Sequence, residues 1–262
     1  MSRMQRKILP GRSYHITHRC YNREFRFQRA IERNNYRMRL FEMSHKYKIK
    51  VLDYMITSNH VHLLLWADIA SEISAAMRFL QGTTAQDFNR RKKHTGAYWS
   101  GRYNTTLIQD GNHLSRCLFY IGLNMVRAKV VKHPSEWQWC GFNEFMGQRK
   151  RYRIIDIEFL LNRLRHSPDI VRFREWYTRT IDDKINLEKV KHESIWSEAM
   201  AVGSQNWLQE ITAALPIKER TIEPVQTIYD TDRDYSLMSV EELEQSYSLK
   251  GTKKEQAYLT RS

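Results

Sequence analysis

The sequence contains few residues of the kinds that build disulfide scaffolds, membrane spans or nucleotide-binding loops. Its three cysteines, Cys20, Cys117 and Cys140, are far apart, which excludes a Cys-x-x-Cys zinc pair and argues against a disulfide framework. No run of about 18 apolar residues is present to cross a bilayer. No Gly-x-x-x-x-Gly-Lys loop is present to hold a nucleotide. These absences predict a protein of the reducing cytoplasm with no membrane segment and no nucleotide cofactor.

Acidic residues are scarce in the first part of the chain. Residues 1–153 hold 28 Lys and Arg against 10 Asp and Glu, a net charge of +18, whereas residues 154–262 hold 15 against 19, a net charge of −4. This asymmetry indicates a first part that faces a polyanion such as nucleic acid. The 10 acidic residues form no cluster, so a site with two metal ions held by carboxylates is not predicted.

Alternating polar and apolar residues predict four strands interleaved with two helices. The predicted strands span residues 13–20, 49–57, 60–66 and 105–109, and the predicted helices begin at about residues 31 and 71. This β-α-β-β-α-β order is that of a ferredoxin-like sheet with helices on one face. The predicted fold class is therefore α+β, with a trailing helix after the last strand and a helical C-terminal appendage.

Two histidines, His60 and His62, flank one apolar residue at the start of the third predicted strand. Because side chains alternate across a strand, both imidazoles point to one face while Val61, Leu63 and Leu65 point into a core. Two imidazoles on one face can converge on a divalent metal ion and leave positions for a third ligand, a water molecule or a phosphate oxygen. The pair is a candidate metal site.

The trailing helix, predicted at residues 112–127, carries the second informative pattern. Its apolar stripe consists of Leu114, Cys117, Leu118, Ile121 and Met125. Another stripe holds Arg116, Tyr120, Asn124 and Arg127 at i, i+4, i+8 and i+11. Such a stripe can supply a nucleophile, a metal ligand and two phosphate clamps. The structural alternative is a half-buried aromatic at Tyr120 and a surface amide at Asn124.

These two patterns occur together with several other motifs. With His60-Val61-His62 on a strand and Tyr120 to Ala128 on a later helix, the chain resembles the single-tyrosine HUH transposases. These are the IS200/IS605-like transposases and their relatives associated with repetitive extragenic palindromes. The resemblance covers about residues 8–147, and its further motifs are Phe79-Leu80-Gln81-Gly82, Phe88-Asn89-Arg90-Arg91, Trp99-Ser100-Gly101-Arg102-Tyr103 and Val131-Lys132-His133-Pro134-Ser135-Glu136-Trp137. Many relatives have proline where Met125 stands, a change that leaves both proposed site residues of this helix in place.

The resemblance implies that His60 and His62 bind the metal ion, that Asn124 is the third ligand and that Tyr120 is the nucleophile. It also implies recognition of DNA hairpins. Mg²⁺ or Mn²⁺ suits phosphate oxygens, and attack by Tyr120 would leave a 5′-phosphotyrosine and a free 3′-OH. The expected function is a metal-dependent DNA transposase that cleaves and rejoins single-stranded DNA near hairpins, without ATP.

Arginines interleave with aromatic residues in two loops, at residues 22–28 and 98–103, as in proteins that bind single strands. The predicted DNA-contacting residues are Arg19, Arg23, Arg26, Arg90, Arg91, Arg102, Arg116 and Arg127. For each loop aromatic the alternative is packing in the core. Two other functions stay open: a catalytically silent regulator that binds DNA hairpins and, less favoured, an HUH replication initiator or relaxase.

The charge pattern divides the chain into a transposase domain (1–148), a helical accessory region (149–220) and an acidic, partly disordered tail (221–262). Amphipathic patterns predict helices at residues 155–164, 170–180 and 204–215. The accessory region is interpreted either as a DNA-contacting unit or as an acidic docking surface. A cytoplasmic protein that associates with the nucleoid when bound to DNA is expected, and the sequence does not decide between a monomer and a homodimer.

Overall fold

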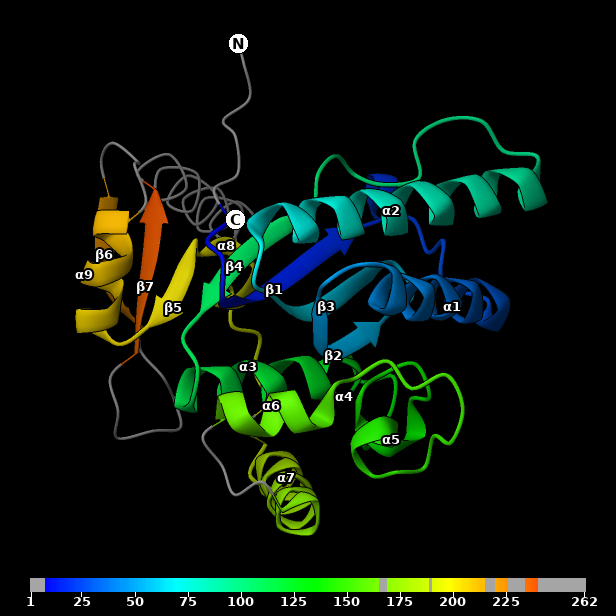
Figure 1. The fold of residues 1–262 in the computed structure, drawn as a ribbon. Helices are drawn as coiled ribbons and strands as arrows, with labels where there is room; N and C mark the ends of the chain where they lie inside the picture. The colour runs from blue at the N-terminus through cyan, green and yellow to red at the C-terminus, as the bar shows by residue number, and fades with distance from the viewer. Residues whose placement is uncertain (1–7, 165–168, 189, 215–219, 226–233, 240–262) are drawn as a thin grey trace, which may run out of the picture.

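A central β-sheet organises the chain in the computed structural model (Figure 1). The structure describes residues 8–164, 169–188, 190–214, 220–225 and 234–239. The strands are β1 (Arg12–Arg19), β2 (Lys50–Ile56), β3 (His60–Ala67), β4 (Asn104–Ile108), β5 (Ala201–Gly203), β6 (Arg220–Val225) and β7 (Asp234–Ser239). Across these described ranges, seven strands pair in the order β2-β3-β1-β4-β5-β7-β6. The β4–β5 pair is parallel and the other pairs are antiparallel.

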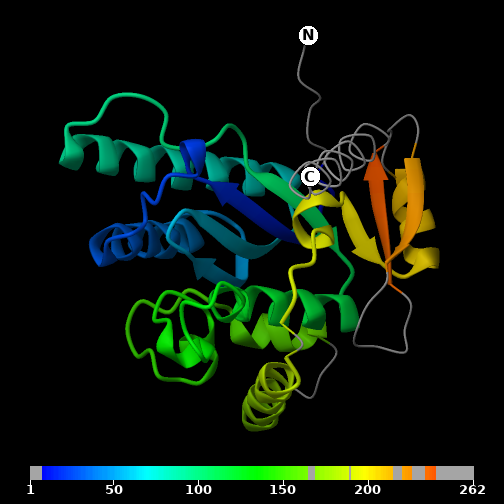
Figure 2. The same ribbon diagram turned by 180° about the vertical axis from the view of Figure 1, so that it is seen from behind.

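Helices lie on both sides of this sheet. Figures 1 and 2 show α1 (Ala30–Lys46) and α2 (Ala70–Lys92) on one side, with α3 (Asn112–Gly122) and α6 (Ile157–Leu164) on the other. The remaining helices are α4 (Asn124–Arg127), α5 (Phe142–Phe145), α7 (Ile170–Asn186), α8 (Ile195–Glu198) and α9 (Gln205–Ala214). Both faces of β3 are therefore covered, which explains why its residues from Val61 to Ala67 are all buried.

The predicted α+β class is confirmed, and the element order β1-α1-β2-β3-α2-β4 is observed. The predicted trailing helix is wrong in one respect, because the structure breaks it at Leu123 (φ −85°, ψ 6°) into α3 and α4. Arg127 Nη1 donates a hydrogen bond to the Tyr120 carbonyl (3.3 Å) across this break. Side-chain periodicity did not reveal the break, since one deviating residue leaves the stripes on both sides in phase.

The register of β1 against β3 decides which histidines share a face. Thr17 lies opposite His62 and Arg19 lies opposite His60. Directly opposed residues of antiparallel strands point to the same side, and His15, two residues before Thr17, shares that side. His18 points to the other face, where its ring stacks on Trp99 with centroids 4.0 Å apart. The face on which His60 and His62 lie is therefore the face that α3 covers.

The C-terminal region is not purely helical as predicted. The predicted helices at 155–164, 170–180 and 204–215 correspond to α6, α7 and α9, but β5 adds in parallel to β4, with Leu107 opposite Ala201. Three residues are too few to show the alternation of polar and apolar residues that marks a strand. This strand forms because it pairs with β4, not because of a pattern in its own sequence. β6 and β7 fall within the segment interpreted as a partly disordered tail. Its residues 226–233 and 240–262 lie outside the described residues.

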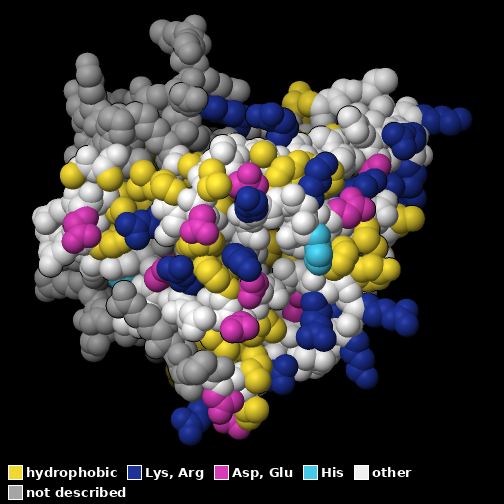
Figure 3. All heavy atoms as spheres, viewed as in Figure 1, with side chains coloured by type: hydrophobic (Ala, Val, Ile, Leu, Met, Phe, Trp, Pro, Cys, Tyr) yellow, Lys and Arg dark blue, Asp and Glu magenta, His cyan; other side chains and the backbone are white. Residues whose placement is uncertain are grey.

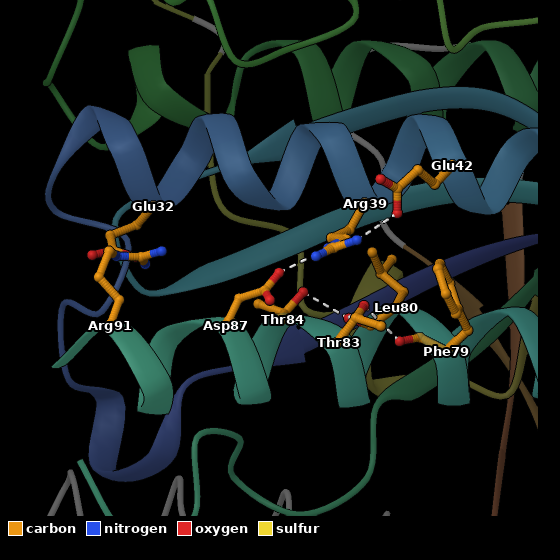
Figure 4. A network of polar contacts seen from close by, with 9 residues as sticks. All are labelled: Glu32, Arg39, Glu42, Phe79, Leu80, Thr83, Thr84, Asp87 and Arg91. Atoms are coloured by element: carbon orange, nitrogen blue, oxygen red, sulfur yellow. Dashed lines mark hydrogen bonds and ion pairs between the residues drawn. The ribbon is translucent and has the colours of Figure 1, made fainter. Parts of the chain in front are cut away.

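An ion-pair network joins α1 to α2 (Figure 4). Arg39 of α1 donates from Nε to Asp87 of α2 (2.7 Å) and from Nη1 to Glu42 (2.8 Å). Glu32, which is buried at the start of α1, pairs with Arg91 near the end of α2. The Arg39 pairs are partly exposed and contribute little stability, so their main effect is to orient the two helices.

The described cysteines, Cys20, Cys117 and Cys140, are all buried free thiols. None of the helices in the described part of the chain is both long enough and apolar enough to cross a membrane.

Asp53 is an acidic residue inside the core. It follows an irregularity in the pairing of β2 with β3, its Oδ1 accepts a hydrogen bond from the Tyr54 amide (2.7 Å), and its Oδ2 is buried with no hydrogen-bond partner among the described residues. Burial raises the pKa of this carboxyl well above its ordinary value. The folded chain then holds a proton that the unfolded chain releases above about pH 4, so stability decreases as the pH rises through the folded pKa.

We expect Asp53→Asn to increase the free energy of unfolding at pH 8, because the neutral amide needs no proton on folding. The gain should shrink as the pH falls towards 4, at up to about 1.4 kcal/mol per pH unit. Urea unfolding of both proteins at pH 5 and pH 8 measures it, and Asp68→Asn, at an exposed position, is the control. A gain that does not depend on pH would mean that Asp53 is ionised in the folded chain.

Candidate active site

Three side chains of the site form a continuous hydrogen-bond chain that ends at a backbone carbonyl. Asn124 Nδ2 lies 2.9 Å from His62 Nε2, and His62 Nδ1 lies 2.9 Å from His15 Nε2. His15 Nδ1 lies 2.5 Å from the carbonyl oxygen of Trp196. The chain joins β1, β3, α4 and α8, which come from four distant parts of the sequence.

His60 lies beside this chain, with its ring centroid 4.9 Å from that of His62. Its Nδ1 lies 2.7 Å from Asn59 Oδ1 and 3.0 Å from Thr57 Oγ1, both in the turn between β2 and β3. Because Asn59 Oδ1 can only accept, His60 carries its proton on Nδ1 and keeps the Nε2 lone pair. The turn therefore orients His60 as well as connecting the two strands.

Burial keeps all three imidazoles neutral. It lowers the pKa of His15 to about 4 and that of His60 to about 3, and it lowers the pKa of His62 well below its ordinary value. In His62 the neighbouring His60 and His15 add to the effect. Only a neutral imidazole can ligate a metal ion, so these rings need not lose a proton at neutral pH before binding one.

Tyr120 packs against the same cluster. Its ring centroid lies 6.1 Å from that of His62 and 6.2 Å from that of His15, and the residue is 6% exposed. Arg127 lies over the ring, with Cζ 4.2 Å from the centroid. Burial raises the pKa of the Tyr120 hydroxyl, whereas the Arg127 charge lowers it. Both structural alternatives from the sequence underestimate burial, because Tyr120 is not half-buried and Asn124, at 8% exposed, is not a surface residue.

The predicted DNA-contacting arginines fall into two groups. Arg19, Arg116 and Arg127 lie at the site: Arg19 is opposite His60, Arg116 Nη2 is 3.9 Å from a Glu193 carboxylate oxygen, and Arg127 covers Tyr120. Burial lowers the pKa of Arg127, whereas the neighbouring Tyr120 and Glu193 raise it. These three place positive charge where a phosphate would meet Tyr120.

The other five predicted arginines have different surroundings. Arg26 is buried, pairs with Glu24 and donates to the Ala97 carbonyl (2.7 Å), so its contacts are structural. Arg91 pairs with Glu32. Arg23, Arg90 and Arg102 are exposed. Figure 3 shows Lys and Arg side chains gathered along the right-hand rim of this face, beside the ends of α1 and α2. A basic surface is present there, at a distance from the hydrogen-bond chain.

The C-terminal region supplies residues to the site that the sequence did not indicate. The Trp196 ring centroid lies 6.0 Å and the His192 ring centroid 6.4 Å from that of Tyr120. Glu193 accepts a hydrogen bond from Trp196 Nε1 (3.0 Å) and faces Arg116. Figure 2 shows the chain passing from α7 beside α3 to reach α8 next to β4. No local signal in the sequence connected Trp196 to Tyr120.

Two imidazoles and one carboxamide at this position have the donor atoms to hold a divalent metal ion. In the described part of the chain, no group of three or more His, Cys, Asp or Glu side chains is arranged to hold a metal ion. The ligand set implied by the sequence contains only two such side chains: a metal ion here would be held by the Nε2 atoms of His60 and His62 and by the Asn124 carboxamide oxygen. The carboxamide now donates to His62, so a half-turn about its Cβ–Cγ bond would present Oδ1 instead.

Residues 10–122 match the family model described as transposase IS200 like. This part of the chain is therefore similar to the IS200-like transposases. The matched segment contains His15, His60, His62 and Tyr120, whereas Asn124 lies two residues beyond its end. The resemblance inferred from the sequence motifs is thereby confirmed.

Two solved structures of transposases are also similar to the chain. A REP-associated tyrosine transposase bound to a REP hairpin has 16% identity and a TM-score of 0.47, covering 60% of this chain and 93% of the other. A candidate transposase from Deinococcus radiodurans, in a crystal structure at 1.90 Å resolution, has 18% identity and a TM-score of 0.31, covering 39% and 83%. TM-scores below 0.5 do not establish a common fold, so the resemblance to transposases rests on the sequence match alone. No curated protein matches the chain.

Proposed function

We propose that this protein is a transposase that cleaves and rejoins single-stranded DNA near hairpins through a covalent bond to Tyr120, with the help of a divalent metal ion. The observation that carries the proposal is the convergence of His62, Asn124 and Tyr120 on one face of the sheet, with Arg127 over the tyrosine ring. Similarity to the family supports the transposase role, and the positive charge around Tyr120 supports a phosphate substrate.

The reaction exchanges one phosphodiester bond for another. The Tyr120 hydroxyl oxygen forms a bond to the scissile phosphorus while the bond from phosphorus to the 3′ oxygen breaks. The phenolic proton passes to solvent, and the leaving 3′ oxygen takes up a proton to become a 3′-OH. A 3′-OH from another strand can reverse the step, since the phosphotyrosine conserves the free energy of the broken bond.

The residues of the chain have separate roles in this step. Arg127 and Arg19 would hold the phosphate and favour the phenolate of Tyr120, and His60, His62 and Asn124 would hold Mg²⁺ or Mn²⁺. The metal ion would supply charge stabilisation to the phosphate oxygens. Tyr120 lies on a helix that is packed against a sheet. Single-stranded DNA can reach it more easily than duplex DNA can, because a base-paired duplex is bulkier than one strand.

A hairpin-binding regulator without catalysis is the second candidate function. The burial of Tyr120, which raises the pKa of its hydroxyl, favours this alternative because a buried phenol is a poor nucleophile. The two functions differ in one product, a covalent protein–DNA adduct.

The deciding experiment incubates the full chain with labelled single-stranded hairpin DNA from the flanks of its own gene, with Mg²⁺, with Mn²⁺ or with EDTA. The proposal predicts an adduct on a denaturing gel in the presence of either metal ion and none in EDTA. Hairpin binding without an adduct on every flanking hairpin would favour the regulator.

The non-specific part of DNA binding should be electrostatic. If three arginines contact phosphates, counterion release should weaken binding by about tenfold or more between 50 and 200 mM salt. Arg19→Gln should weaken binding and reduce the salt dependence, measured by fluorescence anisotropy. Arg172→Gln is the matched control, because Arg172 is a highly exposed arginine on α7. Equal effects of the two substitutions would contradict the placement of Arg19 at the phosphate.

A further inference from the structure

The hydrogen-bond chain in the site has a direction that its two ends set. The carbonyl oxygen of Trp196 can only accept, so the proton of His15 must be on Nδ1, which lies 2.5 Å away. At the other end, the Asn124 amide nitrogen can only donate, and it lies 2.9 Å from His62 Nε2, so His62 accepts there and carries its proton on Nδ1. His62 Nδ1 therefore donates to His15 Nε2 across the 2.9 Å contact.

The rings of His15 and His62 are oriented for this bond. Their planes are within 4° of parallel and their centroids are 5.1 Å apart. His15 Nε2 and His62 Nδ1 are only 2.9 Å apart, much closer than the two ring centroids. The rings therefore meet edge to edge rather than face to face. This is the in-plane geometry of an N–H···N hydrogen bond.

The consequence falls on the other nitrogen of His62. With its proton on Nδ1, His62 keeps the Nε2 lone pair directed at Asn124, at 2.9 Å. This is the lone pair that a metal ion needs. Metal-binding histidines usually donate their second N–H to a carboxylate, a carbonyl or water, which fixes the tautomer and the ring orientation. In this chain another histidine accepts that N–H, and a carbonyl from a distant segment fixes the histidine.

We propose that His15 and the Trp196 carbonyl are positioning groups that lock His62 in the tautomer able to bind the metal ion, and that the accessory region thereby forms part of the site. The inference rests on the proposed function, since it assigns a role relative to the proposed metal site. Segment 192–199 then has a role that neither reading of the accessory region from the sequence, DNA contact or docking, anticipated.

Thr106 offers a matched control for this proposal. Its hydroxyl donates to the same Trp196 carbonyl (3.2 Å) and to the Ala199 carbonyl (2.7 Å). Thr106→Val therefore loosens the same segment while leaving His15 and its two hydrogen bonds in place. A general loss of packing near α8 should appear in both the Thr106 and the His15 variants, whereas loss of the tautomer lock should appear only in the latter.

The first test is the tautomer of His62 in the metal-free full chain, read from long-range ¹H–¹⁵N correlation spectra of its imidazole. The proposal expects the proton on Nδ1 in the wild type and in Thr106→Val, and a mixture or the opposite tautomer in His15→Phe. A wild-type His62 with its proton on Nε2 would overturn the proposal without any variant.

The second test is Mn²⁺ affinity of the same proteins by titration calorimetry. His15→Phe should bind Mn²⁺ about 10–100-fold more weakly than the wild type. Thr106→Val should bind it within about twofold of the wild type, and His15→Gln, which can both accept and donate, should recover part of the loss. The proposal is wrong if His15→Phe binds Mn²⁺ like the wild type, or if Thr106→Val loses as much affinity as His15→Phe. Either of these results would contradict the positioning role but not the proposed metal site. A wild type that binds no Mn²⁺ would instead reject both the metal site and the positioning role.

Discussion

Tyr120→Phe should abolish formation of the covalent DNA adduct, reducing it by more than about 10³-fold, while hairpin binding stays close to that of the wild type. Phenylalanine removes only the hydroxyl oxygen that is proposed to attack the phosphate. It keeps the ring that packs against His15, His62 and Trp196 and that lies under Arg127. The free energy of unfolding should change by at most about 0.5–1.5 kcal/mol, which is the contribution of one hydrogen bond. The measurement is a denaturing gel with Mg²⁺ or Mn²⁺, alongside a binding assay on the same hairpin.

Tyr177→Phe is the matched control for this experiment. Tyr177 is a fully buried tyrosine of α7, its ring stacks on Phe119, and its hydroxyl has no hydrogen-bond partner among the described residues. Its loss should leave the adduct unchanged. If Tyr120→Phe forms the adduct as well as the wild type does, Tyr120 is not the nucleophile and the regulator becomes the better proposal.

His60→Ala should produce the second large effect, a fall in cleavage of about 10²-fold or more together with a loss of Mn²⁺ affinity. A metal ion at a phosphate contributes several kcal/mol of charge stabilisation, and each 1.36 kcal/mol corresponds to a factor of ten in rate. His60 tests the metal site more cleanly than His62, because His62 also bonds to His15 and Asn124 and its removal would take one hydrogen bond from each of them. DNA binding should persist through phosphate contacts elsewhere.

His18→Ala provides the comparison for His60→Ala. His18 lies opposite Val61 in the register of β1 and β3, so it belongs to the same part of the sheet but points to the other face. Its removal costs the stacking on Trp99 and should leave the Mn²⁺ affinity unchanged. Mn²⁺ binding by His60→Ala at wild-type strength would exclude His60 as a ligand.

The sequence indicated the elements of the site because each depends on a local rule. Alternation along a strand placed His60 and His62 on one face, and helical spacing placed Tyr120 and Asn124 on one stripe. Those two faces meet in the structure, where Asn124 contacts His62. Whether the cluster holds a metal ion, and whether Tyr120 attacks DNA, are predictions that the experiments above test.

The contact between His15 and His62 could not be predicted from local sequence rules. Alternation along β1 puts His15 on the side of Thr17 and Arg19, but its contact with His62 depends on the register between β1 and β3, in which Thr17 lies opposite His62. Register is set by the pairing of two strands that are more than 40 residues apart in the sequence, and a shift of one residue would have turned every side chain to the other face. A lone histidine in a strand carries no sign of such a partner.

The accessory region depended still more on tertiary structure. Charge and amphipathic spacing were sufficient to predict α6, α7 and α9, because a helix displays its buried stripe in its own sequence. The strand β5, the break at Leu123 and the position of Trp196 beside Tyr120 have no such local signature. A three-residue strand forms because β4 presents a free edge, and the Trp196 carbonyl reaches His15 because β5 brings the preceding segment back to the sheet. The chemistry of the site could therefore be predicted from residue types and periodicity, whereas the contacts that orient it required the packing of segments distant in the chain.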